Sequence, residues 1–453
     1  MLRDSLAGAF KAYDIRGRVP DELDQESVWA IARAYARVFG PGCVALGHDI
    51  RPSSESLAAA VADGLRTEGV DVMDIGLCGT EEMYFATFHL NLDGGIMVTA
   101  SHNPKNYNGL KLVREQARPI SEDTGLKRIA VATWEQVTTG GRTPGRYRQV
   151  SIRDAYVKHL TGCIDRNRIA GANLLVNAGN GCAGPAFDAL AAELQLTVTR
   201  MNHEPDGRFP NGVPNPLLTE NRLETSRQVI ANDAQLGIAW DGDFDRCFVF
   251  DEKGEFIDGY YLIGLLAASF LEANPGQCIV HDPRLIWNTV DVVNGHDGTT
   301  ALSRCGHTFM KETMRTRDAI YGGEMSGHHY FRDFGYCDSG MLPWLRLLEV
   351  MATANLPLSR LVEARKARFP ISGEINFTVR DQAGILDAIE RAFEPLADSH
   401  SRFDGLSMEF RDWRFNVRPS NTEPLLRLNV ETRGDPGLLT DRTAALTSLL
   451  TQN

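Results

Sequence analysis

The chain has 453 residues, of which 43% are hydrophobic and 23% are charged, and its formal net charge is −12. This composition is typical of a soluble globular protein, and the length corresponds to about three domains of ~150 residues each. The acidic net charge argues against nucleic acid and against an anionic membrane surface as partners. The amino terminus lacks the apolar segment of a signal peptide, and the longest apolar run, Tyr260–Leu271, is too short to span a bilayer. We therefore expect a cytoplasmic protein.

Eight cysteines are scattered along the chain, and no two of them form a Cys-x-x-Cys pair. This spacing argues against a zinc knuckle and against a redox dithiol. Several lie within apolar runs, as Cys247 and Cys278 do. We expect them to be small buried hydrophobic residues in a reducing compartment.

The first part of the chain alternates predicted strands with predicted helices. Apolar, β-branched runs predict strands, and apolar residues that recur every three or four positions predict helices. The predicted elements are a strand and turn over 10–17, a helix over 27–39, a strand over 43–47, a helix from an N-cap at Ser53 or Ser54 to Leu65, a strand over 70–76, a helix over 81–89 and a strand over 94–98. This alternation is the signature of βαβ units and a mainly parallel sheet.

The segment after the strand over 94–98 carries Ser101 and is predicted to turn, since Asn103-Pro104 is a turn dipeptide. Open α/β sheets place their ligands at the carboxyl ends of strands. With His102 beside it and Lys111 past the loop, Ser101 is a candidate nucleophile or phosphate carrier. The alternative is a turn serine that hydrogen-bonds its own backbone.

A second α/β unit is predicted after a linker at Thr138–Gly145. It contains a helix over 152–164 and a strand over 173–177, followed by a glycine-rich turn over 177–184 into another helix. That turn lacks a Walker lysine and does not match dinucleotide-binding spacing, so we interpret it as strand–helix geometry rather than as a phosphate loop. Residues 205–216 are rich in proline, glycine and asparagine, which predicts an exposed loop.

Three aspartates at a spacing of two, Asp241, Asp243 and Asp245, lie within residues 235–250. At ~4 Å and an effective dielectric constant of ~20, each pair of carboxylates repels by about 4 kcal/mol, so the triplet requires a cation. Ligands that offer only oxygen indicate Mg²⁺ or Ca²⁺. An EF-hand is excluded because Arg246 stands where the loop needs glycine and because residues 247–250 read as a strand.

A third α/β unit is predicted beyond the turn at 251–254, with a helix from Tyr260 and a strand over 278–281. Further along, Glu324, Ser326 and His328 alternate after a short strand. An acceptor, a hydroxyl and an imidazole on one side of the chain suit sugar hydroxyls. The alternative is a glycine-rich connection with incidental polar residues.

The composition changes again near residue 369, and the last segment carries a donor-rich loop. A predicted strand delivers Arg418 into this loop, where Ser420, Asn421 and Thr422 follow. A guanidinium fork with hydroxyl and amide donors can cradle a phosphate. Such a loop can equally satisfy its own backbone.

Taken together, four motifs resemble the α-D-phosphohexomutase superfamily, specifically its bacterial phosphomannomutase/phosphoglucomutase branch. The motifs are Thr99–Pro104, Asp241–Arg246, Gly323–His328 and Arg418–Thr422. The resemblance implies an α/β protein of four domains: three related α/β/α units with mixed, mainly parallel sheets, and a smaller C-terminal α+β domain like that of the TATA-box-binding protein. We place these domains at 1–145 (phosphoserine-bearing), 146–252 (metal-binding), 253–368 (sugar-recognising) and 369–453 (phosphate-binding).

The resemblance also implies roles for individual residues. Ser101 would carry a phosphoryl group and would bind Mg²⁺ together with Asp241, Asp243 and Asp245. The catalytic candidates would be Ser101, His102, Lys111 and Arg246, with Lys111 and His102 as acid/base candidates. The substrate-binding candidates would be Tyr13, Arg16, Arg284, His307, Lys311, Glu324, Ser326, His328, Arg418, Ser420, Asn421 and Thr422. Phe244 departs from the pattern, since many relatives carry glycine there.

The implied activity is reversible conversion of mannose 6-phosphate and mannose 1-phosphate through a hexose 1,6-bisphosphate, feeding GDP-mannose synthesis. The implied partners are small hexose phosphates, and the implied assembly is a monomer or homodimer. Alternatives are a phosphoglucomutase or dual-specificity enzyme, a phosphoglucosamine mutase, a metal-dependent phosphatase and a non-catalytic sugar-phosphate binder. Met325 favours the mannose/glucose branch over the glucosamine one by resemblance.

Overall fold

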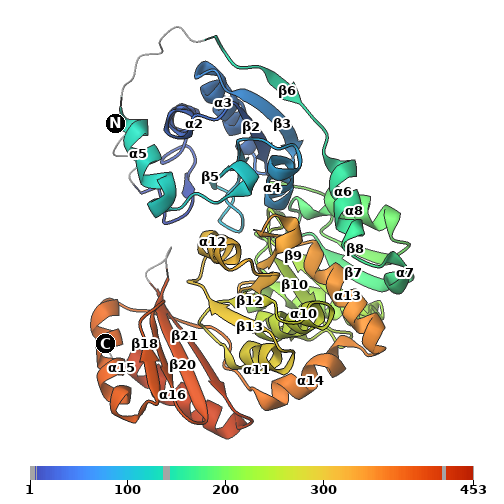
Figure 1. The fold of residues 1–453 in the computed structure, drawn as a ribbon, viewed down its shortest axis with the longest axis vertical. Coiled ribbons are helices and arrows are strands. Elements are labelled where there is room, and N and C mark those ends of the chain that lie inside the picture. The colour runs from blue at the N-terminus through green and yellow to red at the C-terminus, as the bar shows by residue number, and fades with distance from the viewer. Residues whose placement is uncertain (1–5, 7, 136–142, 421–424, 452–453) are drawn as a thin grey trace. The chain divides into compact units, whose positions relative to one another are not determined.

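The computed structural model describes residues 6, 8–135, 143–420 and 425–451, and Figure 1 shows their arrangement. The chain divides into two compact units. The first comprises Met1–Phe256 and His328–Asn355, and the second comprises Ile257–Gly327 and Leu356–Asn453. Within the described part of the chain, no helix is long and apolar enough to cross a membrane.

The first sheet of the first unit has six strands. Its order is β1 (Ile15–Arg18), β5 (Tyr107–Arg114), β4 (Gly94–Val98), β2 (Cys43–His48), β3 (Asp71–Leu77) and β6 (Tyr147–Gln149). The strands β4, β2, β3 and β6 are parallel, whereas β5 runs antiparallel to both β1 and β4. Because these four strands are parallel, their carboxyl ends lie at the same edge of the sheet, and so do the loops that follow them. The Ser101 loop, which follows β4, is one of these loops.

In the described part of the chain, four helices pack on this sheet. Their apolar residues recur at helical spacing, so each helix has an apolar face that can be buried. The helices are α2 (Gln25–Phe39), α3 (Ser54–Thr67), α4 (Thr80–His89) and α5 (Lys127–Trp134). In α2, Val28, Ile31 and Tyr35 are fully buried in the core beneath the sheet, and an Asp24–Ser27 capping box starts the helix.

A second sheet of the first unit carries the metal loop. It contains β8 (Thr197–Met201), β7 (Asn173–Asn177), β9 (Leu236–Trp240) and β10 (Cys247–Phe250) in this order, with β10 antiparallel to β9 and the others parallel. The aspartate triplet forms the connection from β9 to β10. The first unit also contains the helices α6 (Arg153–Gly162), α7 (Arg166–Ile169), α8 (Ala183–Glu193), α9 (Leu223–Ala231) and α13 (Leu342–Ala354). Its strands β15 (His329–Phe331) and β16 (Cys337–Asp338) are not part of this second sheet and pair antiparallel with each other.

The second unit begins within β11 (Phe256–Ile257) and contains a third set of parallel strands. β12 (Cys278–His281) pairs in parallel with β13 (Thr299–Leu302) on one side and with β14 (Tyr321–Gly323) on the other. The helices are α10 (Gly259–Ala273), α11 (Trp287–Gly295), α12 (His307–Arg317) and α14 (Leu358–Arg368). The central helix α10 carries no charge before Glu272 and is buried over most of its length.

The C-terminal part is an antiparallel sheet with two helices (Figure 1). The strand order is β17 (Ile375–Thr378), β21 (Leu425–Thr432), β20 (Trp413–Pro419), β19 (Leu406–Glu409) and β18 (Ser399–Ser401), and the helices are α15 (Gln382–Phe393) and α16 (Pro436–Thr451). Short helical turns complete the chain at η1 (Glu115–Ala117), η2 (Glu122–Leu126), η3 (Thr219–Asn221), η4 (Arg332–Phe334) and η5 (Glu394–Leu396).

The structure differs from the sequence prediction in several details. Ser53 precedes α3 but makes no capping hydrogen bond; its hydroxyl instead accepts from Asn108 Nδ2 at 2.8 Å. The antiparallel strand β5, which carries Lys111, was not predicted. Of the predicted linker at 138–145, residues 138–142 lie outside the described part of the chain, and β6 beyond it pairs with β3.

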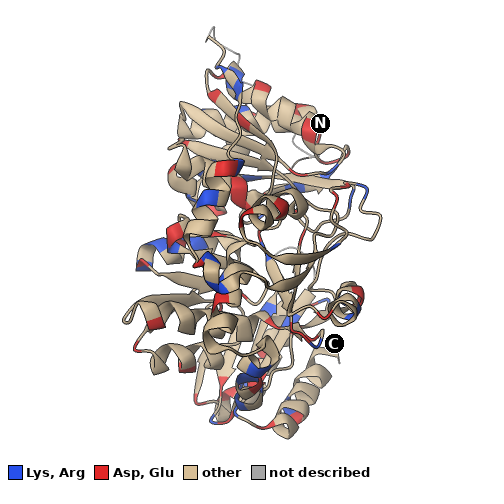
Figure 2. Cartoon of the chain, turned by 90° about the vertical axis from the view of Figure 1, so that its right-hand side faces the viewer, with Lys and Arg blue, Asp and Glu red and all other residues tan. Residues whose placement is uncertain are grey.

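Acidic and basic residues are mixed, and in the view of Figure 2 they do not separate into a basic and an acidic side. They are interspersed along the helices and loops. The cations that an anionic substrate needs therefore have to come from particular loops, which are described next.

Candidate active site

The loop after β4 holds Ser101 in a buried, strained position. Ser101 is 1% exposed and has a φ of 49°, in the left-handed region that serine rarely adopts. Its Oγ donates to Asp241 Oδ2 at 2.8 Å, and His102 Nδ1 lies 3.1 Å from the same Oγ. The predicted serine, the adjacent histidine and the first aspartate are thus brought together.

The Ser101 loop is shaped by an arginine that the sequence analysis did not single out. Arg51, in the loop after β2, donates to the backbone carbonyl oxygens of Ser101 at 2.8 Å and Asn103 at 2.6 Å. It also donates to those of Pro104 at 2.7 Å and Tyr107 at 3.0 Å. One guanidinium therefore fixes four carbonyl groups of the turn, which explains why the loop can hold its strained conformation.

Asp49 extends this support to the serine backbone. Its carboxylate accepts from the Arg51 backbone N–H at 2.9 Å, from Ser54 Oγ at 2.5 Å and from Thr99 Oγ1 at 2.7 Å. Thr99 Oγ1 in turn accepts from the Ser101 N–H at 2.9 Å. The parallel strands β2 and β4 thus place a short hydrogen-bond chain under the serine.

The three aspartates form a buried cluster. Asp241, Asp243 and Asp245 are each at most 1% exposed, and they present one oxygen each within 4.8 Å of the others. The Oδ1 atom of every one of them lacks a hydrogen-bond partner among the described residues. Burial and the two neighbouring carboxylates raise the pKa of Asp241 to about 7. Unpaired buried carboxylate oxygens at this spacing fit a hard divalent cation.

Lys111 and Thr80 bind the Oδ2 atoms of Asp243 and Asp245. Lys111 Nζ donates to Asp243 Oδ2 at 2.7 Å and to Asp245 Oδ2 at 2.5 Å. Although burial disfavours the ammonium form, these two carboxylates raise the pKa of Lys111. Thr80, the first residue of α4, donates from Oγ1 to Asp243 Oδ2 at 2.5 Å and from its N–H to the Asp243 carbonyl at 3.0 Å. The sequence analysis missed Thr80.

Phe244 is fully buried, with a φ of 42°. A Cβ atom at Gly79 would overlap its ring. The departure from glycine at position 244 is therefore accommodated by a glycine at the start of α4.

Further predicted residues surround the cluster. Arg246 Nε lies 3.4 Å from Asp241 Oδ2, and Arg16 Nη1 donates to Asn103 Oδ1 of the Ser101 loop at 2.6 Å. Tyr13 precedes Arg16 on the segment that enters β1. His328 was predicted to act with Glu324 and Ser326, but its Nε2 lies 3.5 Å from Asp245 Oδ1, beside the carboxylates.

Within the second unit, a separate group of predicted residues occupies the loops after β12, β13 and β14. Arg284 is buried and donates to both oxygens of Asp282, from Nε at 3.0 Å and Nη2 at 2.8 Å. Asp282 Oδ2 also accepts from the Met325 N–H at 2.9 Å, and Glu324 Oε1 accepts from the Gly306 N–H at 2.8 Å. These bonds tie the three loops together. Of the remaining predicted residues, His307 and Lys311 are buried on α12, and Ser326 is half-buried.

The C-terminal sheet adds a cluster of arginines. Arg418 on β20 lies opposite Arg427 on β21, and Arg418 Nε has no hydrogen-bond partner among the described residues. Glu374 accepts from Arg427 Nη1 at 3.1 Å and from Arg284 Nη1 at 3.2 Å. Although burial opposes ionisation, these arginines lower the pKa of Glu374. Ser420 Oγ accepts from Arg427 Nη2 at 3.2 Å.

The predicted cradle residues Asn421 and Thr422 lie outside the described part of the chain. Glu374 and Asp282 were not predicted. The Asp-Pro-Arg order at 282–284 after a parallel strand was the available signal for Asp282.

Family models match the chain in four consecutive segments. They are described as phosphoglucomutase/phosphomannomutase alpha/beta/alpha domain I over residues 7–136, domain II over 154–254, domain III over 258–369, and the C-terminal domain over 374–447. The chain belongs to the phosphoglucomutase/phosphomannomutase family.

Individual relatives of this family cover nearly the whole chain. A phosphomannomutase of Salmonella typhimurium strain LT2 is 56% identical over 98% of this chain and 99% of that protein. A protein of Xanthomonas campestris pv. campestris strain B100 named phosphohexose mutases is 53% identical, again over 98% of this chain and 99% of its own. The crystal structure of a phosphoglucomutase/phosphomannomutase family protein from Burkholderia thailandensis is 33% identical, with a TM-score of 0.87 and coverage of 98% of both chains.

Family membership confirms several predictions made from the sequence. The four motifs identified the superfamily correctly, and the four-domain α/β architecture with a C-terminal antiparallel sheet is confirmed. The chain is an enzyme, a phosphohexomutase of the isomerase class. Its acidic triad at the end of β9 is a site that can hold a metal ion.

Proposed function

We propose that this phosphohexomutase interconverts mannose 6-phosphate and mannose 1-phosphate, with Ser101 as phosphoryl carrier. The observation that carries the proposal is the 2.8 Å hydrogen bond from Ser101 Oγ to Asp241, within a cluster of three buried carboxylates. A serine that only closed a turn would not need a four-carbonyl arginine clamp and an adjacent cation site. The name of the Salmonella relative supports mannose phosphate as the substrate.

In the proposed reaction, the phosphoryl group on Ser101 moves to the free hydroxyl of a hexose phosphate. The bond between Ser101 Oγ and phosphorus breaks, and a bond forms between phosphorus and the sugar oxygen, which gives a hexose 1,6-bisphosphate. The sugar hydroxyl loses a proton, and Ser101 Oγ gains one. His102, with its Nδ1 3.1 Å from that Oγ, is placed to exchange this proton. The second half-reaction returns the other phosphoryl group to Ser101.

Asp241, Asp243 and Asp245 are proposed to hold Mg²⁺, with an oxygen at Ser101 as a further ligand. When bound, the ion would neutralise charge on the phosphoryl group and on the serine oxygen. Lys111 keeps its proton between two of the carboxylates, so it supplies a fixed positive charge at the same place. Arg246 and Arg16 add further cations beside the Ser101 loop.

The second group of residues is proposed to bind the sugar phosphate. Arg418, Arg427 and Arg284, with Ser420, Asn421 and Thr422, would bind the phosphate that is not being transferred. Glu324 and Ser326 would accept and donate to sugar hydroxyls, and His307 and Lys311 would contact the substrate beside them. Tyr13 is proposed to line the substrate path next to Arg16, and His328 to act beside Asp245.

The remaining expectations are proposals of the same kind. We propose domain boundaries at 145/146, 252/253 and 368/369; β6 still belongs to the first sheet and β11 to the second, so the chain leaves each of these sheets a few residues beyond the first two boundaries. We also propose a cytoplasmic enzyme, a monomer or homodimer, that feeds GDP-mannose synthesis. The eight cysteines are all free thiols, as a reducing compartment would keep them.

The decisive experiment compares turnover of mannose 1-phosphate and glucose 1-phosphate with Mg²⁺ and catalytic hexose 1,6-bisphosphate, while free phosphate is followed. Preference for mannose, or parity, supports the proposal. Parity would agree with the name of the Xanthomonas relative, phosphohexose mutases. A strong preference for glucose would make the enzyme a phosphoglucomutase. Phosphate release without isomerisation from Ser101-phosphorylated protein would refute the mutase assignment.

A further inference from the structure

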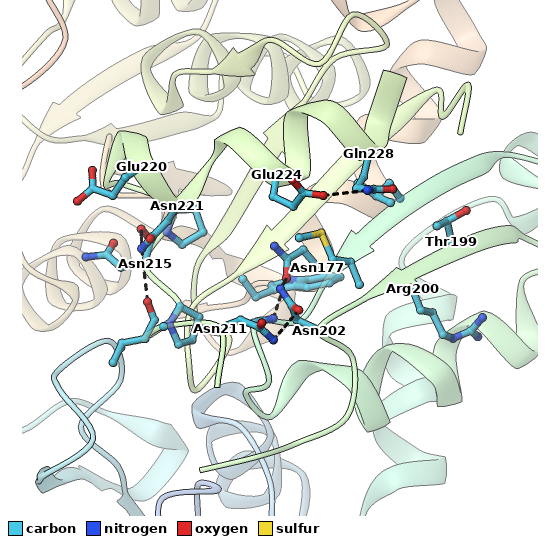
Figure 3. A pocket seen from close by; sticks show the side chains of 18 residues that line it. Asn177, Thr199, Arg200, Asn202, Asn211, Asn215, Glu220, Asn221, Glu224 and Gln228 are labelled. Atoms are coloured by element: carbon cyan, nitrogen blue, oxygen red, sulfur yellow. Dashed lines mark hydrogen bonds between the residues drawn. The ribbon is translucent and has the colours of Figure 1, made fainter. Parts of the chain in front are cut away.

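A cavity lies in the α/β domain that carries the aspartate triplet. It has a volume of about 530 Å³ and is lined from the carboxyl ends of β7 and β8, from α9 and from the long loop between β8 and η3 (Figure 3). This volume lies within the range of small-molecule sites, roughly 300–1,000 Å³. The carboxyl edge of a parallel sheet is also where open α/β proteins bind ligands. The sequence analysis predicted residues 205–216 only as an exposed loop.

The loop that forms one wall is fixed by side-chain amides. Asn180 Nδ2 donates to the Glu204 carbonyl at 2.9 Å, and Asn211 Nδ2 donates to Asn180 Oδ1 at 2.9 Å and to Asn202 Oδ1 at 2.8 Å. At its far end, Asn221 Nδ2 donates to the Asn215 carbonyl at 3.0 Å. A long connection without regular structure that is nevertheless held in one conformation is typical of a binding loop.

The chemistry of the lining favours an uncharged, hydroxyl-rich ligand. The polar lining consists mainly of side-chain amides, each with two donor hydrogens and an acceptor oxygen. They are Asn177, Asn202, Asn211, Asn215, Asn221 and Gln228. Asn177, Asn202 and Gln228 each use one amide hydrogen within the protein, which leaves the second for a ligand hydroxyl. Glu220 and Glu224 would repel a phosphate, and the cation of the lining, Arg200, is already paired with Asp188 at 2.8 Å. Leu175, Met201 and Pro214 supply apolar surface for the carbon atoms of such a ligand.

The other face of the same loop packs against the catalytic loops. The Arg51 guanidinium, which clamps the Ser101 loop, lies over the Phe209 ring at 5.4 Å. A Cβ atom at Gly207 would overlap the Ile50 carbonyl, and one at Gly242 of the metal loop would lie 3.9 Å from Pro214. The cavity is therefore separate from Ser101 and the carboxylates but shares a wall with the residues that support them.

We propose that this cavity is a second binding site, specific for an uncharged saccharide. Because the amides that line it also fix the 202–218 loop, the bound saccharide stabilises the wall against which Arg51 packs. The proposal concerns a site distinct from the catalytic one and does not depend on the proposed mutase reaction.

The test is a ligand-detected NMR titration with methyl α-D-mannopyranoside, a neutral sugar without phosphate. Thr199→Phe fills the cavity from β8, whereas Thr197→Phe places the same side chain on the same face of β8, two residues away and outside the cavity. Gln228→Leu removes one lining amide without adding bulk. Saturating glucose 1,6-bisphosphate occupies the proposed catalytic site, and unchanged melting temperatures establish that each variant is folded.

We expect saturable binding to the wild type and to Thr197→Phe, at least tenfold weaker binding to Gln228→Leu, and none to Thr199→Phe. The bisphosphate should leave the titration unchanged. Absence of saturable binding to the wild type would overturn the proposal, as would equal binding to Thr199→Phe. Displacement by the bisphosphate would also overturn it, because the sugar would then be in the catalytic site.

Discussion

Arg51 and Ser101 are joined by a hydrogen bond of 2.8 Å from the guanidinium to the serine carbonyl, and the same guanidinium fixes three further carbonyls of the loop. A serine with a φ of 49° stays in that conformation only if its surroundings hold it there. The position of the reacting oxygen therefore depends on a side chain that belongs to another loop, fifty residues earlier in the sequence.

Arg51→Lys should lower kcat by about 100-fold, because an ammonium with three donors cannot reach four carbonyls and the Ser101 Oγ would shift. Steady-state mutase kinetics and phosphorylation of Ser101 by hexose 1,6-bisphosphate would measure this. Arg146→Lys is the matched control, since Arg146 is largely exposed and pairs with Asp71. A wild-type kcat in Arg51→Lys would show that the Arg51 hydrogen bonds are not needed to position Ser101.

Thr80 should tune the affinity of the carboxylate cluster for a divalent cation. Thr80→Val keeps the shape of the side chain but removes the 2.5 Å hydrogen bond to Asp243 Oδ2, and outer hydrogen bonds of this kind are worth about 10–100-fold in metal affinity. Calorimetric titration of metal-free protein with Mg²⁺ or Mn²⁺ measures the change directly, without an activity assay. Thr80→Ser retains the hydroxyl and should bind like the wild type. Equal metal affinities in the wild type, Thr80→Val and Thr80→Ser would show that the Thr80 hydroxyl does not contribute to metal binding.

Gly79 and Phe244 should behave as a coupled pair. Gly79→Ala alone pushes a methyl group into the buried Phe244 ring, and overpacking of this kind costs about 1–3 kcal/mol. In a Phe244→Gly background, the same alanine has space, so its cost should largely vanish. Urea denaturation of the four proteins of this cycle gives the coupling free energy. Equal costs of Gly79→Ala in both backgrounds would show that the ring and the helix start do not constrain each other.

The sequence predicted those parts of the site whose functional residues are close together in the chain. Ser101 with His102, and the three aspartates at a spacing of two, reveal their chemistry without knowledge of the fold. Arg51 and Thr80 do not, because their partners are distant: Thr80 and Asp243 are separated by 163 positions. Only the pairing of strands and the packing of α4 against the metal loop bring them together.

The fold shows the same division. Strands with a continuous apolar run, such as Leu174–Val176 in β7 and Cys247–Phe250 in β10, were predicted with the correct ends, because a buried strand has a recognisable composition. The strand β5 was missed because its apolar residues are mixed with Asn108, Lys111 and Arg114. Burial of Lys111 in that strand makes sense only once Asp243 and Asp245 are opposite it.

Glu81 should make the stability of the first unit depend on pH. This fully buried carboxyl group accepts hydrogen bonds from the hydroxyl groups of Tyr156 and Ser339 and from the N–H groups of Gly340 and Met341, just before α13. Burial outweighs these donors and raises the pKa of Glu81 to about 8. In the unfolded chain a glutamate has a pKa of about 4.3.

Between these two pKa values, the folded state binds a proton that the unfolded state has released. The free energy of unfolding therefore falls as the pH rises from about 4.3 to 8, by at most about 1.4 kcal/mol per pH unit, and is constant with respect to this group above that range. Glu81→Gln, which cannot ionise, should lose this part of the pH dependence. Thermal unfolding should be measured at a series of pH values. As the pH rises, the melting temperature of Glu81→Gln should increase relative to that of the wild type. Glu122→Gln, at an exposed glutamate, serves as control. Parallel curves for wild type and Glu81→Gln would mean that Glu81 is ionised in the folded protein across the whole range, with its four donors outweighing burial.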